Sequence, residues 1–169
     1  MKKCANPMTS FDNLSQHITG FHGYEQPGRR ERSDRLFRDF LVKQTKSLLK
    51  LLGHKFDAAD ADYQHRVDEN VKSSKRKLLT ISESLKNPTY IEALFFTKSN
   101  LPENLMSKIY ELECHMLEEI KNINDEIKAL FLPKIKKDVF EDRFLHIHDF
   151  IDYLNQYLFE RESLILGDY

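Results

Sequence analysis

The C-terminal part of the chain carries the clearest hydrophobic pattern. Its apolar residues recur at steps of four and three positions, the spacing of a helical stripe that packs lengthwise against other helices. They are Phe140, Phe144, Ile147, Ile151, Leu154, Leu158 and Ile165. The pattern predicts one long helix over 140–165, with these residues as its packing seam. One charged residue, Arg161, takes the position where the next apolar residue is expected.

A charge in such a seam has three structural solutions. The guanidinium of Arg161 reaches solvent along its stem, pairs with a carboxylate, or belongs to a surface that another molecule covers. We expect a pair with the preceding long helix, near Glu111 or Glu113, because antiparallel neighbours joined around Pro133 bring these levels together.

Three earlier stretches repeat the same spacing of apolar residues. They predict long helices over about 33–53, over about 62–86, and from about 100 to Pro133. A short helix is expected over 88–96, and strand signals are absent from the sequence. Long helices joined by short connections predict an all-α fold, an antiparallel up-and-down four-helix bundle with short N-terminal and connecting helices.

Capping residues predict where these helices begin and end. Ser33 is placed to cap the first long helix, and Gly53 is placed to stop it. Asn100, with Glu103 three residues later, resembles a capping box at the start of the third.

The N-terminal residues differ in composition from the rest. Residues 1–32 hold three of the five glycines and a charged run behind Pro27. They predict an arm with a short helix over 10–18 and a flexible loop, followed by a helical bundle domain over 33–169.

Composition and charge narrow the class of protein. The chain has 169 residues, of which 40% are apolar and 31% charged, as in one globular domain. A net charge of −1 lacks the strongly basic footprint of a nucleic-acid binder, so we expect no direct nucleic-acid contact. No apolar run approaches the roughly 20 residues of a membrane span, so we expect no membrane contact. Cys4 and Cys114 lie far apart and no secretory segment is evident, which favours a cytoplasmic protein.

Catalytic and metal-binding motifs are sparse. The chain has no glycine elbow, Walker loop or dinucleotide fingerprint, so we expect no enzymatic activity and no cofactor. Helical bundles are common containers for metal, and His115 with Glu119 has a hemerythrin-like spacing of four. His65 with Glu69 has it too, but on the solvent side of its helix. A metal-binding bundle, hemerythrin- or ferritin-like, therefore stays an alternative.

Four segments, in order along the chain, resemble the Rsd/AlgQ family of helical regulators. They are Phe11-Asp-Asn-Leu-Ser-Gln-His-Ile-Thr-Gly20; Asp34-Arg35-Leu36 with Leu51-Leu-Gly53; Lys108-Ile-Tyr110 with Glu118-Glu-Ile120 and Asp125; and Leu154-Asn-Gln-Tyr-Leu-Phe-Glu-Arg-Glu-Ser-Leu-Ile165. The match spans most of the chain, with Arg161 where the family carries a glutamate. The resemblance implies a bacterial anti-sigma-factor regulator that binds the primary sigma factor of RNA polymerase.

The resemblance also implies a partner-binding surface. The promoter-reading sigma domain presents a basic helix-turn-helix surface, so its captor should offer carboxylates around an apolar centre. The candidate partner-binding residues are Asp34, Arg35, Phe37, Glu111, Glu118, Phe159, Arg161 and Glu162. A helical adaptor for another protein partner is a further alternative, and the sequence does not indicate an oligomeric state.

Overall fold

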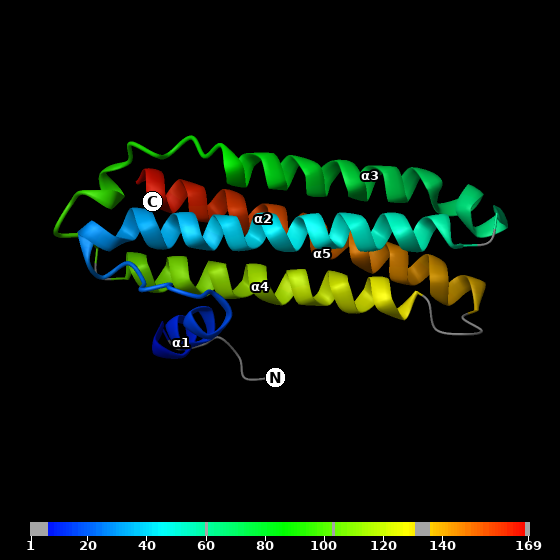
Figure 1. Cartoon of the computed structure of the whole chain (residues 1–169), viewed down its shortest axis with the longest axis horizontal. Helices are drawn as coiled ribbons and strands as arrows, with labels where there is room; N and C mark the ends of the chain where they lie inside the picture. Colours follow the sequence, from blue (N-terminus) through cyan, green and yellow to red (C-terminus); the bar gives the residue numbers. More distant parts are fainter. Residues whose placement is uncertain (1–6, 60, 103, 131–135, 168–169) are drawn as a thin grey trace.

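The computed structural model describes residues 7–59, 61–102, 104–130 and 136–167 (Figure 1). Its regular elements are α1 Pro7–His17, α2 Pro27–Asp57, α3 Ala61–Lys86, the 3-10 helix η1 Leu94–Phe96, α4 Leu105–Ala129 and α5 Lys137–Leu166. No strand occurs within these residues. The predicted all-helical fold is confirmed.

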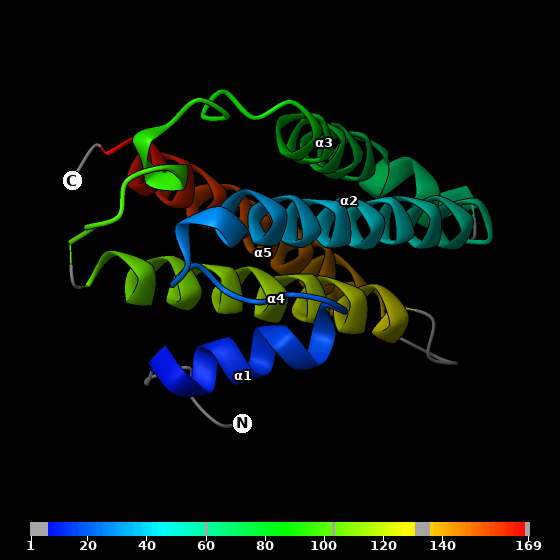
Figure 2. The ribbon, with the colours of Figure 1, turned by 60° about the vertical axis from the view of Figure 1, so that its left-hand side comes forward.

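The four long helices pack side by side into an elongated helical bundle (Figures 1 and 2). α2 packs along α3 and α4 along α5, and these two pairs join through contacts of α2 with α4 and of α3 with α5. Although α3 and α4 follow one another in sequence, they make no contact within the described ranges. The chain direction alternates from each long helix to the next, as expected from the sequence (Figure 1). The neighbour relation of α3 and α4 expected in an up-and-down bundle is absent, because residues 87–102 carry the chain across one end of the bundle. α1 lies against α4.

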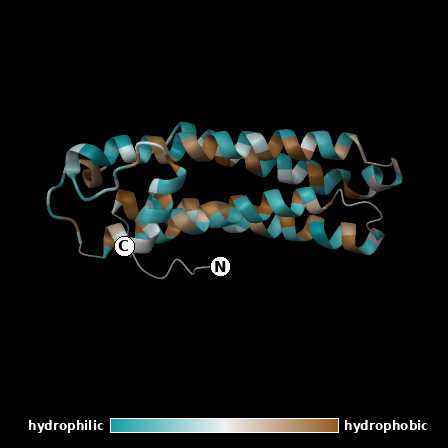
Figure 3. Cartoon of the chain, turned by 60° about the horizontal axis from the view of Figure 1, so that its bottom comes forward, coloured by the Kyte–Doolittle hydropathy of each residue, from teal (hydrophilic) through white to brown (hydrophobic). Residues whose placement is uncertain are grey.

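The seam of α5 forms one wall of the core. All seven apolar seam residues of α5 are at most 5% exposed, and each stabilises the fold by roughly 1.5–3 kcal/mol. Bands of hydrophobic residues recur between hydrophilic ones along the helices in Figure 3, as a helical spacing of apolar residues predicts. The left-handed residue Gly167 follows the end of α5, where glycine carries no Cβ penalty.

The predicted ends of the first long helix are wrong. α2 begins at Pro27, because proline is favoured in the first turn of a helix, where its missing N–H would have no partner. Ser33 lies inside α2 with its side chain buried, so it is no cap. Gly53 is also inside, and the helix continues to Asp57. The predicted domain boundary at residue 32 consequently falls within α2.

The start of α4 and the connection before it also differ from the prediction. Asn104, not Asn100, precedes the first helical residue, and Glu103 lies outside the described residues. The helix expected over 88–96 is reduced to turns and η1. Its residues Tyr90, Phe95 and Phe96 are buried at the end of the bundle, and the backbone turns so that all three rings point inward.

None of the described helices combines the length and apolar character that a membrane span requires.

Candidate functional site

Arg161 is fully buried, and its guanidinium is the centre of a polar cluster at one end of the bundle. Its Nε donates a hydrogen bond to Glu113 Oε1 at 2.8 Å, and its Nη1 donates to the Tyr90 hydroxyl at 2.8 Å. Its Nη2 donates to Asp34 Oδ1 at 2.7 Å and to the Tyr24 hydroxyl at 3.1 Å. We call these five residues the Arg161 cluster. The predicted pair with α4 is confirmed at Glu113.

Further hydrogen bonds hold the two carboxylates of the Arg161 cluster. The Tyr24 hydroxyl donates to Glu113 Oε1 at 2.5 Å, and the Tyr90 hydroxyl donates to Asp34 Oδ1 at 3.1 Å. Arg38 donates to the second oxygen of Asp34 at 2.8 Å. Glu113 Oε2, by contrast, is buried without a hydrogen-bond partner in the described structure. The negative charge of Asp34 is thus better compensated by hydrogen-bond donors than that of Glu113.

Burial governs the electrostatics of the cluster. Burial raises the pKa of Glu113 to about 7, although hydrogen bonds from Arg161 and Tyr24 lower it. Burial also lowers the pKa of Arg161, but the neighbouring phenols and carboxylates outweigh it and raise that pKa well above its usual value. Burial raises the pKa of Tyr90 to about 12. The cluster therefore holds a cation permanently inside the bundle, beside a carboxyl group that titrates near neutral pH.

The segment before α2 places Tyr24 in this cluster. The Tyr24 N–H donates to the Tyr110 hydroxyl at 2.7 Å, and its carbonyl accepts from Arg30 Nε at 2.5 Å. Arg30 is itself only 1% exposed, and its Nη1 donates to the carbonyls of Phe95 and Lys98 at 2.9 and 2.7 Å. Arg30 therefore ties the segment before α2 to the segment around η1.

Sequence reasoning missed Tyr24, Tyr90 and Arg30. One signal for additional partners was present, because a buried guanidinium has five N–H donors and a single carboxylate cannot satisfy them. The hydrogen bonds of the Arg161 cluster join α2, α4, α5 and two connecting segments through one cation.

The structure divides the eight predicted partner-binding residues between different environments. Asp34, Phe37 and Arg161 are buried together, with the guanidinium 5.0 Å from the centre of the Phe37 ring. Arg35 is exposed on α2, and Glu162 is half-buried next to Arg161. The remaining three lie on or beside the outer face of α4 and α5: Glu111, Glu118 and Phe159. The role of all eight in partner binding stays a prediction.

The outer face of α4 and α5 carries a groove of about 500 Å³, which we call the α4–α5 groove. Its lining residues are Lys108, Glu111, Leu112, His115, Tyr157, Phe159, Glu160, Ser163 and Leu164. The ring of Phe159 is 69% exposed, and the rings of His115 and Tyr157 stack with centroids 5.2 Å apart. Glu111 and Glu160 contribute carboxylates. The groove thus combines exposed apolar surface with negative charge.

His115, which forms the hemerythrin-like pair with Glu119 in the sequence, lies in the α4–α5 groove. His115 is 3.9 Å from Glu111 and 3.6 Å from Glu118, whereas Glu119 accepts a hydrogen bond from Asn122 at 3.2 Å. In the part of the chain that the structure describes, no group of three or more His, Cys, Asp or Glu side chains is arranged to hold a metal ion. Metal binding stays a sequence-based alternative.

Comparisons with known proteins give no family assignment. No protein-family model, no curated protein and no solved structure matches this chain.

Proposed function

We propose that the protein is a non-enzymatic binding protein that holds a basic helical segment of another protein in the α4–α5 groove. The observation that carries this proposal is Phe159, a large aromatic side chain that is 69% exposed in a groove with carboxylates along it. Aromatic side chains in grooves are typical anchors of protein interfaces, where a few such residues supply most of the binding energy.

The charges around the groove favour a basic partner. Glu111 and Glu160 line it, and Glu118 lies beside His115, whereas Lys108 is the lysine among its lining residues in the described part of the chain. Opposite charges across an interface accelerate association and exclude partners of the wrong sign. An amphipathic helix with basic residues beside its apolar stripe satisfies both the apolar surface and the carboxylates.

The partner that we propose is the promoter-reading domain of the primary bacterial sigma factor, which would make the protein a cytoplasmic transcription regulator. Two of the segments that resemble the Rsd/AlgQ family support this choice, because they lie on the two helices that line the groove. Lys108-Ile-Tyr110 and Glu118-Glu-Ile120 belong to α4, and residues 154–165 belong to α5. We interpret the four long helices as a four-helix bundle that presents this surface.

Isothermal titration calorimetry with the isolated sigma domain tests the proposal. We expect binding at low salt that weakens as the salt concentration rises, because exposed charges are screened. Phe159→Ala should weaken binding at least about tenfold. Leu145→Ala removes another exposed apolar side chain of α5 outside the groove and should leave the affinity unchanged.

Two outcomes of these measurements would contradict the proposal. An absence of heat with the sigma domain at low salt, at several temperatures, would refute the proposed partner. Equal losses for Phe159→Ala and Leu145→Ala would remove the groove as its site. An unbiased pull-down with wild type and Phe159→Ala then tests the alternative of a helical adaptor. Another protein that binds wild type but not Phe159→Ala would support that alternative.

A further inference from the structure

The near-zero net charge of the chain conceals a separation of charge between helices. α2 carries nine Arg and Lys residues and four Asp and Glu residues. α4 and α5 together carry six Arg and Lys residues and thirteen Asp and Glu residues. The basic character of α2 is therefore masked in the sequence average by the acidic helices of the same bundle.

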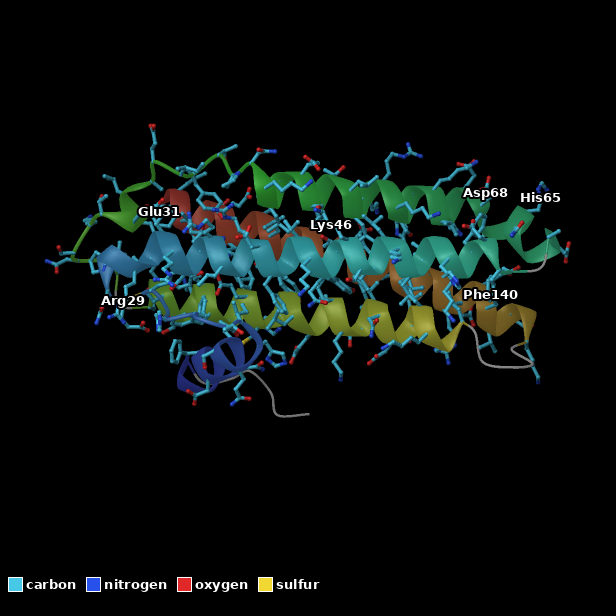
Figure 4. All side chains as sticks on the ribbon, viewed as in Figure 1. Arg29, Glu31, Lys46, His65, Asp68 and Phe140 are labelled. Atoms are coloured by element: carbon cyan, nitrogen blue, oxygen red, sulfur yellow. The ribbon has the colours of Figure 1, made fainter. Side chains whose placement is uncertain are left out.

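The cations of α2 form a stripe along its solvent face. Five exposed residues share this face at helical spacings: Arg32, Arg35, Lys43, Lys46 and Lys50. We call them the α2 stripe. At 3.6 residues per turn all five fall within about 80° of the helix circumference. Asp39 lies on the same face and interrupts the stripe. Figure 4 labels Lys46, midway along α2.

The cations of the α2 stripe are not engaged in ion pairs in the described part of the chain. Lysines on α3 behave differently, since Lys72 pairs with Asp68, Lys77 with Asp152, and Lys86 with Glu83. A row of unpaired cations raises the local concentration of polyanions.

The surroundings of the α2 stripe favour a phosphate backbone over a protein partner. None of the exposed large apolar side chains among the described residues lies on α2. A protein interface has an apolar core, and single-stranded nucleic acid binds to aromatic stacking surfaces, so the stripe lacks the anchor of either. Contacts to phosphates need only the cations.

The α2 stripe is long enough to reach several phosphates of a duplex. From Arg32 to Lys50 the helix rises about 27 Å, the length of about eight base pairs of B-form DNA. The phosphates that border the wide major groove of B-DNA are accessible to a straight helix, whereas the major groove of A-form RNA is deep and narrow.

We propose that the α2 stripe binds the phosphate backbone of double-stranded DNA without reading its sequence. This binding surface shares no residue with the α4–α5 groove and does not depend on the function proposed for that groove. It also revises the expectation from net charge that the chain makes no direct nucleic-acid contact.

Fluorescence anisotropy with a labelled duplex of about 24 base pairs and arbitrary sequence tests this proposal. We expect binding at about 50 mM salt and a logarithmic salt dependence with a slope of about −4, as expected for five cations that contact phosphates. The triple variant Lys43→Gln, Lys46→Gln, Lys50→Gln should bind at least about tenfold more weakly, with a slope reduced by about three. Asp39→Asn should bind about two- to threefold more tightly, because it removes the carboxylate that interrupts the stripe.

A matched triple variant separates the stripe from a general charge effect. Lys98→Gln, Lys121→Gln and Lys128→Gln remove the same charge from exposed sites outside both α2 and the α4–α5 groove, and this variant should stay within about threefold of wild type. Circular dichroism melting checks that both triple variants are folded. No binding of the duplex by wild type at about 50 mM salt would overturn the proposal, as would equal losses for the two triple variants. Tighter binding of single-stranded DNA, double-stranded RNA or polyglutamate than of the duplex would overturn it as well.

Discussion

The Arg161 guanidinium fills a seam position where an aliphatic side chain would be expected. Removing a charge from water is costly, and the cost is recovered only when good partners surround it. All three nitrogens of Arg161 donate hydrogen bonds, and two of the acceptors are carboxylates. The residue is therefore tolerated inside the core because Asp34 and Glu113 approach it from α2 and α4.

Loss of this cation should be strongly destabilising. In Arg161→Leu, Glu113 stays buried without a compensating charge, whereas Asp34 keeps its contact with Arg38. We expect the free energy of unfolding, measured by urea denaturation at pH 8, to fall by about 3–5 kcal/mol. Arg76→Leu, which replaces an exposed arginine of α3, should change it by less than about 0.5 kcal/mol.

A double variant tests whether the lost stability comes from the unpaired charge. Arg161→Leu with Glu113→Gln replaces the uncompensated carboxylate with a neutral group, so the loss should be smaller than the sum of the two single losses. The mechanism would be wrong if the two losses added, or if Arg161→Leu raised the melting temperature.

At the residue scale, the sequence predicts one of the four hydrogen-bond partners of Arg161. Antiparallel helices joined near Pro133 place Glu113 opposite Arg161, and this pair was predictable from helix register alone. Tyr24 and Tyr90 come from connecting segments, for which no periodicity fixes the position of a side chain. The sequence predicts Asp34 on an exposed surface, but Asp34 lies on the buried face of α2, in line with Phe37 and Leu41.

At the element scale, interior positions were predicted better than ends. Apolar spacing located all four long helices, because burial of one face of each helix is what stabilises it. Local preference predicts that the helix stops at Gly53, yet α2 packs against α3 and continues past this residue to Asp57. The sequence predicts a short helix over 88–96, but the rings of this segment are buried and Arg30 donates a hydrogen bond to the Phe95 carbonyl, which holds the segment in turns and η1.

The segment between α1 and α2 depends on a glycine. Gly23 has a φ of +74°, and a Cβ there would lie 2.6 Å from Glu25 Oε2, 3.0 Å from Phe11 and closer still to the Tyr110 hydroxyl. Gly23→Ala combines backbone strain with displacement of the hydroxyl that holds the Tyr24 N–H. We expect the free energy of unfolding, measured by chemical denaturation, to fall by about 1–3 kcal/mol.

Gly28→Ala is the matched control for Gly23→Ala. A Cβ at Gly28 meets no atom within 4 Å, and alanine has the higher helix propensity, so this variant should be neutral or more stable by up to about 1 kcal/mol. Equal effects at the two glycines would show that the segment carrying Tyr24 is not held by the close contacts of Gly23.

At the scale of the whole molecule, the charge of this chain is arranged by helix. The acidic α4 and α5 form the proposed groove, and the basic α2 carries the proposed DNA-binding stripe. The charges of the two surfaces largely cancel in the net charge of −1, so the net charge alone does not reveal either surface. Both surfaces emerge only when each charge is assigned to a helix face, and the start of α2 at Pro27 adds Arg32 to the stripe.

The stability of the whole molecule should depend on pH through Glu113. Its pKa is about 7 in the folded protein and has the ordinary value of 4.5 when burial is lost, so the folded state binds a proton more tightly. This contribution is fully present below pH 4.5 and is lost as pH rises from about 4.5 to about 7, with a total of up to about 3 kcal/mol. The charged groups that face Glu113 are Arg161 from α5 and Asp34 from α2, with the Tyr24 hydroxyl.

Urea denaturation of wild type and Glu113→Gln at about pH 5 and pH 8 isolates this contribution. Because glutamine does not titrate, the free energy of unfolding of wild type relative to Glu113→Gln should be lower at pH 8 than at pH 5. Glu111→Gln removes an exposed carboxylate from the same helix outside the Arg161 cluster, and it should follow wild type at both pH values. A wild type that gained stability relative to Glu113→Gln between pH 5 and pH 8 would mean that Arg161 keeps Glu113 ionised throughout. The cluster would then act as a permanent ion pair, and the proton at Glu113 would have no part in holding α4 against α5.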